Sequence, residues 1–292
     1  MNVSDFTKMR NRMKARIFWN QICKYLFITG TLISLVFLTV LFMRIILQGF
    51  PYLDWHFLNS LPSRKPEDAG IYTAMNGTLW LIAIVAPVSM ISGVGTALYL
   101  EEYAKKNKFT TFIQVNIANL AGVPSVVYGV LGLTIFVRAL HLGTSVLAAG
   151  LTMSLLILPV VIVAAQEAIR SIPNSLREAS YAMGATKWQT ILRVVLPAAI
   201  PGILTGTILA LSRAIGETAP LVVLGVPLFL AFLPTSIFDD FTALPMQIYN
   251  WTSRPQHEFH SLAAAGIIVL LGLLLLMNSV AILLRNKFQK RY

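Results

Sequence analysis

Two sets of residues in this chain have types and spacings suited to a specific task. The first set lies in the interval 167–193 and just beyond it, and it combines one acid, several small residues and a proline. Its fixed positions are Glu178, Ala179, Ser180, Gly184, Val194, Leu196 and Pro197. Arg177 stands beside this set, and the charges of Arg177 and Glu178 could pair with a partner protein or with neighbours in the chain. No nucleophile–base constellation accompanies the pattern, so it indicates recognition rather than catalysis.

Local signals predict that this interval folds as two short helices separated by a turn. Ser175 and Glu178 have the spacing of a capping box after Pro173, which predicts the start of the first helix. Gly184 ends that helix, and segment 186–189 repeats the capping pattern and opens the second. We expect a slim knob on the cytoplasmic side that can enter a groove on a soluble partner. The alternative is an interfacial helix pair that only anchors the flanking segments.

The second set comprises Arg213 and Glu217, charges that lie well inside a predicted helix. Because they are four residues apart, they share one helix face and can pair. A charge within a bilayer is costly, so such residues usually face a cavity or a partner. We expect Arg213 to contact a passing anion through its planar guanidinium, with Glu217 keeping the contact weak. The alternative is a structural ion pair that only fixes the helix.

Several uncharged polar residues are further candidates for lining a polar path between the helices. Asn119, Ser125 and Tyr128 lie around Pro124, which is expected to kink its helix. Thr218 follows directly on Glu217 and is placed in the same candidate path. Ordinary helix packing is the alternative for each of these residues.

The elements that must position these residues are membrane helices. Hydrophobic residues make up 56% of the chain, charged residues only 12%, and the mean hydropathy is +0.71. A soluble domain carries about twice that charged fraction. Uncharged runs long enough to span a bilayer, which takes about 20 helical residues, predict an all-α polytopic protein with six transmembrane helices. The runs are 25–43, 69–100, 109–137, 142–166, 194–212 and 261–284.

A seventh uncharged run, 218–238, contains three prolines. We therefore assign its start to the fifth helix and the rest to an external loop. Six helices place most of the 23 basic residues on the cytoplasmic side, where short basic loops stay. The N-terminus (residues 1–24) and the tail (residues 285–292) are then both cytoplasmic. The net charge of +11 reflects this topology and anionic lipid headgroups, not nucleic acid.

The sequence predicts no catalytic residue, no metal site and no bound cofactor. It lacks the G-x-x-x-x-G-K-[ST] phosphate loop, so any ATP and Mg²⁺ would bind to a separate ATPase. His257 and His260 flank Glu258 in an external loop, where a solvated surface is expected. The single Cys23 cannot form an intrachain disulfide.

The spacing around Glu178 resembles the cytoplasmic docking loop of bacterial ABC-transporter permeases, E-A-A-x3-G-x9-I-x-L-P, with Ser180 and Val194 as substitutions of similar size. Segment 206–221, GTILALSRAIGETAPL, resembles the fifth-helix signature of phosphate-specific permeases, and the Ala-Pro after Thr218 favours the A-type family, PstA. Segments 70–78, 98–103 and 244–249 agree, so the resemblance runs from about residue 70 to residue 284.

The resemblance implies a type I ABC importer permease fold, with residues 72–284 as the permease domain and 25–71 as an N-terminal helix and external loop. It also implies a sister permease (PstC-like), an ATPase dimer (PstB-like) and an extracytoplasmic phosphate-binding protein (PstS-like). Phosphate as substrate rests on the resemblance alone, and sulfate or molybdate is the alternative. An ATP-independent channel or secondary transporter would usually show an inverted repeat, which is not seen.

Overall fold

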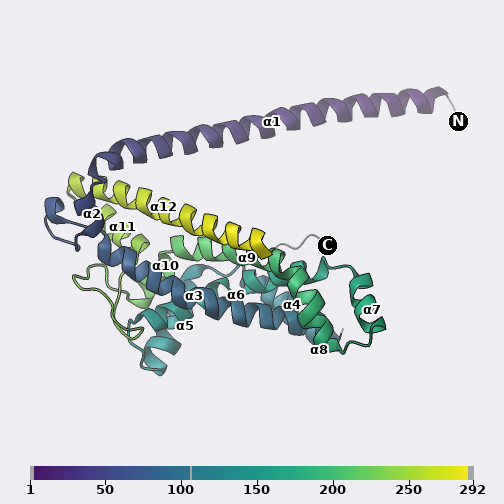
Figure 1. Ribbon diagram of the computed structural model, residues 1–292. Coiled ribbons are helices and arrows are strands. Elements are labelled where there is room, and N and C mark those ends of the chain that lie inside the picture. Colours follow the sequence, from purple (N-terminus) through teal and green to yellow (C-terminus); the bar gives the residue numbers. More distant parts are fainter. Residues whose placement is uncertain (1–2, 106, 289–292) are drawn as a thin grey trace.

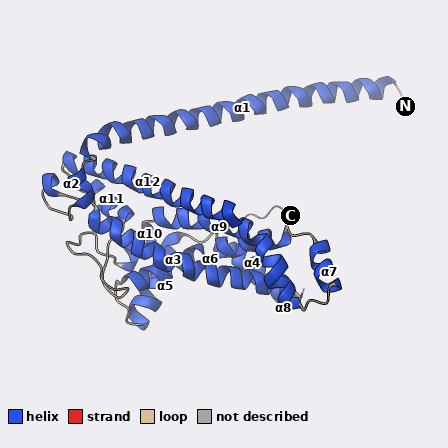
Figure 2. Cartoon of the chain, in the orientation of Figure 1, coloured by secondary structure: helices blue, strands red, loops and turns tan. Residues whose placement is uncertain are grey.

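The computed structural model describes residues 3–105 and 107–288, and this part of the chain consists of helices joined by loops (Figures 1 and 2). Its β-structure is limited to one isolated bridge between Ser145 and Asp240. A helix satisfies its backbone donors and acceptors within itself, which a hydrocarbon environment demands. The prediction of an all-α protein is confirmed.

Five helical segments are long and apolar enough to cross a membrane, and a sixth is interrupted. The five are built from α1 (Val3–Gly49) with η1 (Phe50–Tyr52), α3 (Tyr72–Leu98) with η3 (Tyr99–Tyr103), α6 (Val146–Arg170), α8 (Lys187–Thr190) with η5 (Ile191–Val195) and α9 (Leu196–Gly216), and α12 (His257–Phe288). The interrupted one consists of α4 (Lys108–Leu120), α5 (Ser125–Gly132) and η4 (Leu133–Ala139), bent by 103°. Counted as one span, it completes the six predicted from the sequence.

The bend in this third span lies where the sequence places a proline. Pro124 has no backbone N–H, and it stands as the N-cap of α5 rather than inside a helix. The hydroxyl of Tyr128 donates a hydrogen bond across the bend to the carbonyl oxygen of Leu120, at 2.9 Å. That carbonyl also accepts a hydrogen bond from the backbone N–H of Val123 at 3.1 Å, so two donors satisfy it where α4 ends. The predicted kink is confirmed, and Tyr128 stabilises it.

The core is organised around α6, whose most apolar stretch is 67% buried. Small residues let α3 approach it closely. A Cβ added at Gly150 would lie 2.6 Å from Cγ2 of Ile84, and one at Gly93 would lie 2.7 Å from Cγ1 of Val161. Close backbone approach at small residues is the usual basis of helix packing in a membrane, where lipid is as apolar as the side chains. The α3–α6 pair thus forms the frame for the other helices.

The connections at one end of the bundle are short helices and loops. They contain α2 (Trp55–Asn59), η2 (Pro66–Asp68) and α11 (Leu244–Thr252), whereas α10 (Ala219–Leu224) packs on α5 within the bundle. As predicted, run 218–238 does not form a seventh span. The assignment of its start to the fifth helix is wrong. α10 is a separate helix, ended by Gly225 with φ +88°. The loop that follows is ordered by Asp239, whose pKa is lowered by hydrogen bonds from the backbone and hydroxyl of Thr235 and the backbone of Ser236.

Helix α1 diverges from the bundle and touches it mainly through α12 (Figure 1). A Cβ at Gly49 would lie 2.6 Å from the backbone of Ala264, so the two helices meet closely at that end. The most apolar stretch of the span 16–52 has no buried residue in this chain. Its side chains are therefore available to lipid or to another membrane protein.

The amino-terminal end of α1, the carboxy-terminal end of α12 and α7 (Asn174–Ala182) lie at the end of the bundle opposite α2 and α11 (Figure 1).

The orientation of this arrangement in the membrane stays a prediction. A fluorescent reporter fused after Tyr292, which lies outside the described residues, should fluoresce in the cytoplasm. A phosphatase inserted at Asp239 should be active outside. Labelling of a cysteine at Lys290, also outside the described residues, by an external impermeant reagent would contradict six helices with cytoplasmic ends.

Candidate functional site

The interval 167–193 contains two short helices, α7 and α8, and residues 174–190 are called the knob below. Gly184 joins the helices with φ +80°, a left-handed conformation that glycine adopts without steric cost. The hydroxyl oxygen of Thr186 accepts a hydrogen bond from the N–H of Gln189 at 3.3 Å, and the Gln189 side chain accepts one from the N–H of Thr186 at 2.9 Å. The turn and the second capping box are therefore confirmed.

The first capping box is wrong. α7 begins at Asn174 with Pro173 as its N-cap, and no side chain caps it. Ser175 is the second residue of the helix, so its hydroxyl does not occupy the cap position that the prediction gave it. The two helices of the knob are also joined through side chains, because the hydroxyls of Ser180 and Thr190 are hydrogen-bonded at 2.9 Å.

The outer surface of the knob combines an acid with exposed apolar side chains. Glu178 and Ala179 are exposed, and within the described residues Glu178 forms no ion pair. Met183 at the turn is 89% exposed and Trp188 is 60% exposed. These side chains are therefore accessible to another protein.

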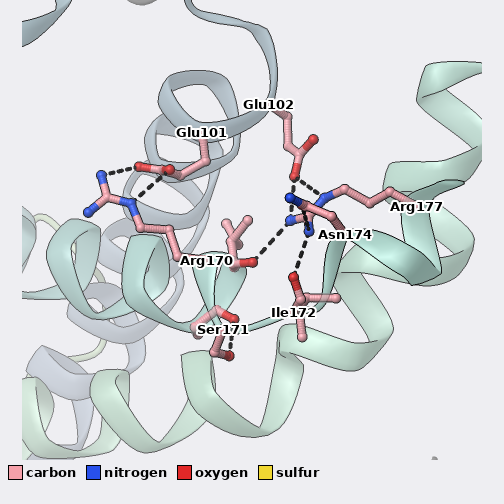
Figure 3. Close-up of polar contacts among 9 residues, drawn as sticks. Glu101, Glu102, Arg170, Ser171, Ile172, Asn174 and Arg177 are labelled. Atoms are coloured by element: carbon pink, nitrogen blue, oxygen red, sulfur yellow. Dashed lines mark hydrogen bonds and ion pairs between the residues drawn. The ribbon is translucent and has the colours of Figure 1, made fainter.

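Arg177 points the other way, into the chain (Figure 3). Its guanidinium donates to one carboxylate oxygen of Glu102 from Nη2 at 3.0 Å and from Nε at 3.2 Å. It also donates to the carbonyls of Ile172 at 2.7 Å and Ile169 at 3.1 Å, and to the Asn174 side chain at 3.2 Å. The side chains of Arg177 and Glu102 are only 16% and 9% exposed. Of the two roles expected for Arg177, the structure shows the intrachain one, and removing one partner of so buried a pair costs about 3–5 kcal/mol.

A second ion pair lies beside the first (Figure 3). Arg170, the last residue of α6, donates to both carboxylate oxygens of Glu101, at 2.7 and 2.9 Å. Gln166 donates to the same carboxylate at 2.7 Å, and Glu167 pairs with Arg170 at 3.2 Å on the open side. Glu101 thus ties η3 to α6, whereas Glu102 ties η3 to α7.

The role of the adjacent acids of η3 was missed in the sequence. Segment 98–103 contributed only to the family resemblance, and nothing local indicates partners 69 and 75 residues away. The sequence feature that could have indicated a role for Glu101 and Glu102 was the rarity of acidic residues in this chain. The chain has only 12 acidic residues, and two of them stand side by side at the end of a membrane span next to a basic loop.

Leu196 and Pro197 connect the knob to the membrane. Both are half-buried and form the first turn of α9, directly after the π-helical turn η5. Proline cannot donate a backbone hydrogen bond, and it is tolerated at the first helical turn or beside a local change of helix geometry. The knob therefore continues into the fifth span without a loop.

Arg213 and Glu217 do not form the predicted pair. α9 ends at Gly216, and Glu217 is its C-cap with an extended ψ of 119°. Pro220 explains the break, because in a continuous helix it could not donate to the carbonyl of Gly216 and would clash with it. Within the described residues no ion pair joins Arg213 to Glu217. Arg213 is exposed in the last turn of α9, where a cation is favoured by the helix dipole.

The two helices that follow the interruptions, α5 and α10, are in contact. A Cβ added at Gly129 of α5 would lie 2.9 Å from the carbonyl oxygen of Pro220 in α10. Ser125 is one turn before Gly129, and Thr218 is two residues before Pro220. Gly129 also lies ten residues before the end of η4 at Ala139. The contact between α5 and α10 therefore lies within the bundle and not at its end.

The other path candidates differ in exposure. Asn119 is exposed near the end of α4, and Ser125 and Thr218 are half-buried. Tyr128 is buried, and its hydroxyl is used across the bend. Its observed contacts are those of the packing alternative. In the part of the chain that the structure describes, no cluster of three or more His, Cys, Asp or Glu residues could hold a metal ion.

The fold is similar to those of solved ABC importer permeases. One match is to a bacterial alginate ABC transporter in complex with an alginate pentasaccharide-bound periplasmic protein. The TM-score is 0.65 at 18% identity, covering 88% of this chain and 91% of that chain. At this identity the match shows the fold alone.

Sequence comparison adds the family. The model described as "Binding-protein-dependent transport system inner membrane component" matches residues 89–290. The phosphate transport system permease protein PstA 1 of Mycobacterium tuberculosis (strain CDC 1551 / Oshkosh) is 33% identical over 95% of this chain and 90% of its own length. PstA of Mycobacterium leprae (strain TN) is 37% identical over 85% and 81%. The chain therefore belongs to the family of binding-protein-dependent transport system inner membrane components, within its group of PstA permeases.

Proposed function

We propose that this chain forms half of the path by which inorganic phosphate is imported, driven by ATP hydrolysis on a separate subunit. As a member of its family it is a multi-pass inner membrane permease of an ABC transporter, and the ATPase is another chain. The observation that carries phosphate as the substrate is the likeness to PstA permeases over most of their length. The exposed guanidinium of Arg213 is consistent with an anionic solute.

The family implies an ATPase and a binding protein as partners. We infer the specific set by the same likeness: a PstC-like sister permease, a PstB-like ATPase dimer and a PstS-like binding protein. The knob is the surface that we assign to the ATPase. Glu178, Ala179 and Met183 are exposed at its outer side, while Ser180 and Gly184 fix the shape beneath them. Leu196 and Pro197 join it to α9.

The path is assigned to the two interrupted helices. Broken helices at membrane depth are tolerated only where other helices cover them or where they line a polar cavity, and transporters use them to form substrate sites. Thr218 lies in one interruption and Ser125 borders the other, with Asn119 just before the bend. Arg213 stands one turn before the interruption at 217–218 and is exposed in this chain. A polar path or a partner must therefore cover it.

Altering the knob should uncouple transport from ATP. Gly184→Val forces a β-branched residue into φ +80°, at a cost of about 1–3 kcal/mol, and Glu178→Lys reverses the outer charge. We expect both variants to reach the membrane and to lose most ATP-dependent phosphate uptake in vesicles that contain the full complex. Glu167→Gln, in an exposed ion pair on the neighbouring helix, is the control and should transport normally. Normal uptake by both knob variants, with the ATPase bound, would count against the assignment.

Replacing Arg213 should stop transport without disassembling the complex. We expect Arg213→Gln to lower phosphate uptake by more than tenfold, and Arg213→Lys to retain part of it, because an ammonium keeps the charge but not the bidentate fork. Arg138→Gln, at an exposed arginine near the end of η4, is the matched control. ATP hydrolysis stimulated by the loaded binding protein should persist in Arg213→Gln. If Arg213→Gln transports phosphate at the wild-type rate, Arg213 is not on the path.

A further inference from the structure

The knob is held to the membrane helices by more than its two chain connections. Within the chain, α7 packs mainly on η5 and α8, both of which belong to the span that follows it. Its strongest polar link to any other span is Arg177, which reaches η3 at the end of α3 (Figure 3). Two donor nitrogens converge on one oxygen of Glu102, and both side chains are largely shielded from water.

Arg177 is a junction rather than a simple ion pair. Its remaining donors bind the carbonyls of Ile169 and Ile172, where α6 ends and the chain turns into α7. The carbonyl of Ile169 also accepts a hydrogen bond from the backbone N–H of Ile172 at 3.3 Å, and the guanidinium adds a second donor there and one for the carbonyl of Ile172. One side chain therefore joins the end of α6, the start of α7 and the end of α3.

A second contact joins η3 to the other helix of the knob. The ammonium of Lys187, the first residue of α8, lies 4.8 Å from the centroid of the Tyr103 ring. An ammonium over an aromatic face is attracted to it. Both helices of the knob thus contact η3, α7 through Glu102 and α8 through Tyr103.

We propose that Glu102 is a positioning residue for energy coupling, which fixes the knob to α3 so that a displacement of the knob by the ATPase moves α3 with it. This rests on the proposed docking role of the knob. Since α3 packs closely along α6 and contacts α9, its movement is felt by the helices next to both interruptions. A rigid, fully hydrogen-bonded link can transmit a displacement that a mobile surface contact would absorb. Neither Glu102 nor Arg177 needs to touch the substrate or the ATPase.

The first test measures phosphate transported per ATP hydrolysed by the reconstituted complex. Glu102→Gln removes the charge but keeps the shape, and it should keep ATPase binding and stimulated hydrolysis while lowering phosphate per ATP at least fivefold. The exchange Glu102→Arg with Arg177→Glu should recover part of the ratio. Glu101→Gln is the matched comparison, because Glu101 lies in the same turn but pairs with α6 and not with the knob. It should keep the wild-type ratio.

Two results would overturn the proposal: a wild-type ratio in Glu102→Gln, or an equal loss in Glu101→Gln and Glu102→Gln, which would indicate only a general loosening of η3. A second measurement does not depend on phosphate. Spin labels at Tyr181 and Ile91, both exposed, in a Cys23→Ser background report the distance from the knob to α3.

When ATP is added to the complex, this distance should stay constant in the wild type and should shift or broaden in Glu102→Gln. Identical distance distributions in the two proteins would contradict the rigid link. If the wild type transports no phosphate but the label distances behave as described, the substrate assignment fails and the link stands.

Discussion

The requirement that every backbone donor and acceptor in the membrane find a partner governs this fold. Helices meet it along their length, which explains why the described chain is almost wholly helical. At two places, 121–124 and 217–218, the helical ladder is interrupted. The first is stabilised by the Tyr128 hydroxyl, and both are covered in part by the contact of α5 with α10. Interruptions of this kind are maintained at a cost, and the contact between the helices that follow them is the strongest structural reason to assign the transport path to them.

The end of the bundle that carries the knob follows a different principle. There the ion pairs of Arg170 and Arg177 join separate elements of the chain. Arg177 and Glu178 are adjacent in sequence yet have opposite roles: the arginine is turned inward to Glu102, and the acid is left on the surface. The knob is in this way both fixed to the bundle and exposed, as its proposed docking role requires.

Three features of the fold could be predicted from short stretches of sequence: the turn of the knob, the cap of α8 and the bend of the third span. Gly184, the Thr186 capping box and the kink at Pro124 depend on a few neighbouring residues, and all three were found. The cap at Ser175 failed because Asn174 already belongs to the helix. The Arg213–Glu217 pair failed because the fifth helix was extended through Pro220, which ends it at Gly216 four residues earlier. The partner of Arg177 lies 75 residues away, and only the packing of α3 against α6 brings it near.

The most direct test of the path is whether Thr218 faces water during transport. In a Cys23→Ser background, a cysteine at Thr218 should react with a charged, membrane-impermeant methanethiosulfonate in the working complex. The reaction should inhibit phosphate uptake, and excess phosphate should slow it more than excess sulfate does. Leu275→Cys on the exposed surface of α12, which is 67% exposed in this chain, should react only with an apolar maleimide. If Thr218→Cys behaves like Leu275→Cys, the break between α9 and α10 faces lipid or protein, and the path lies elsewhere.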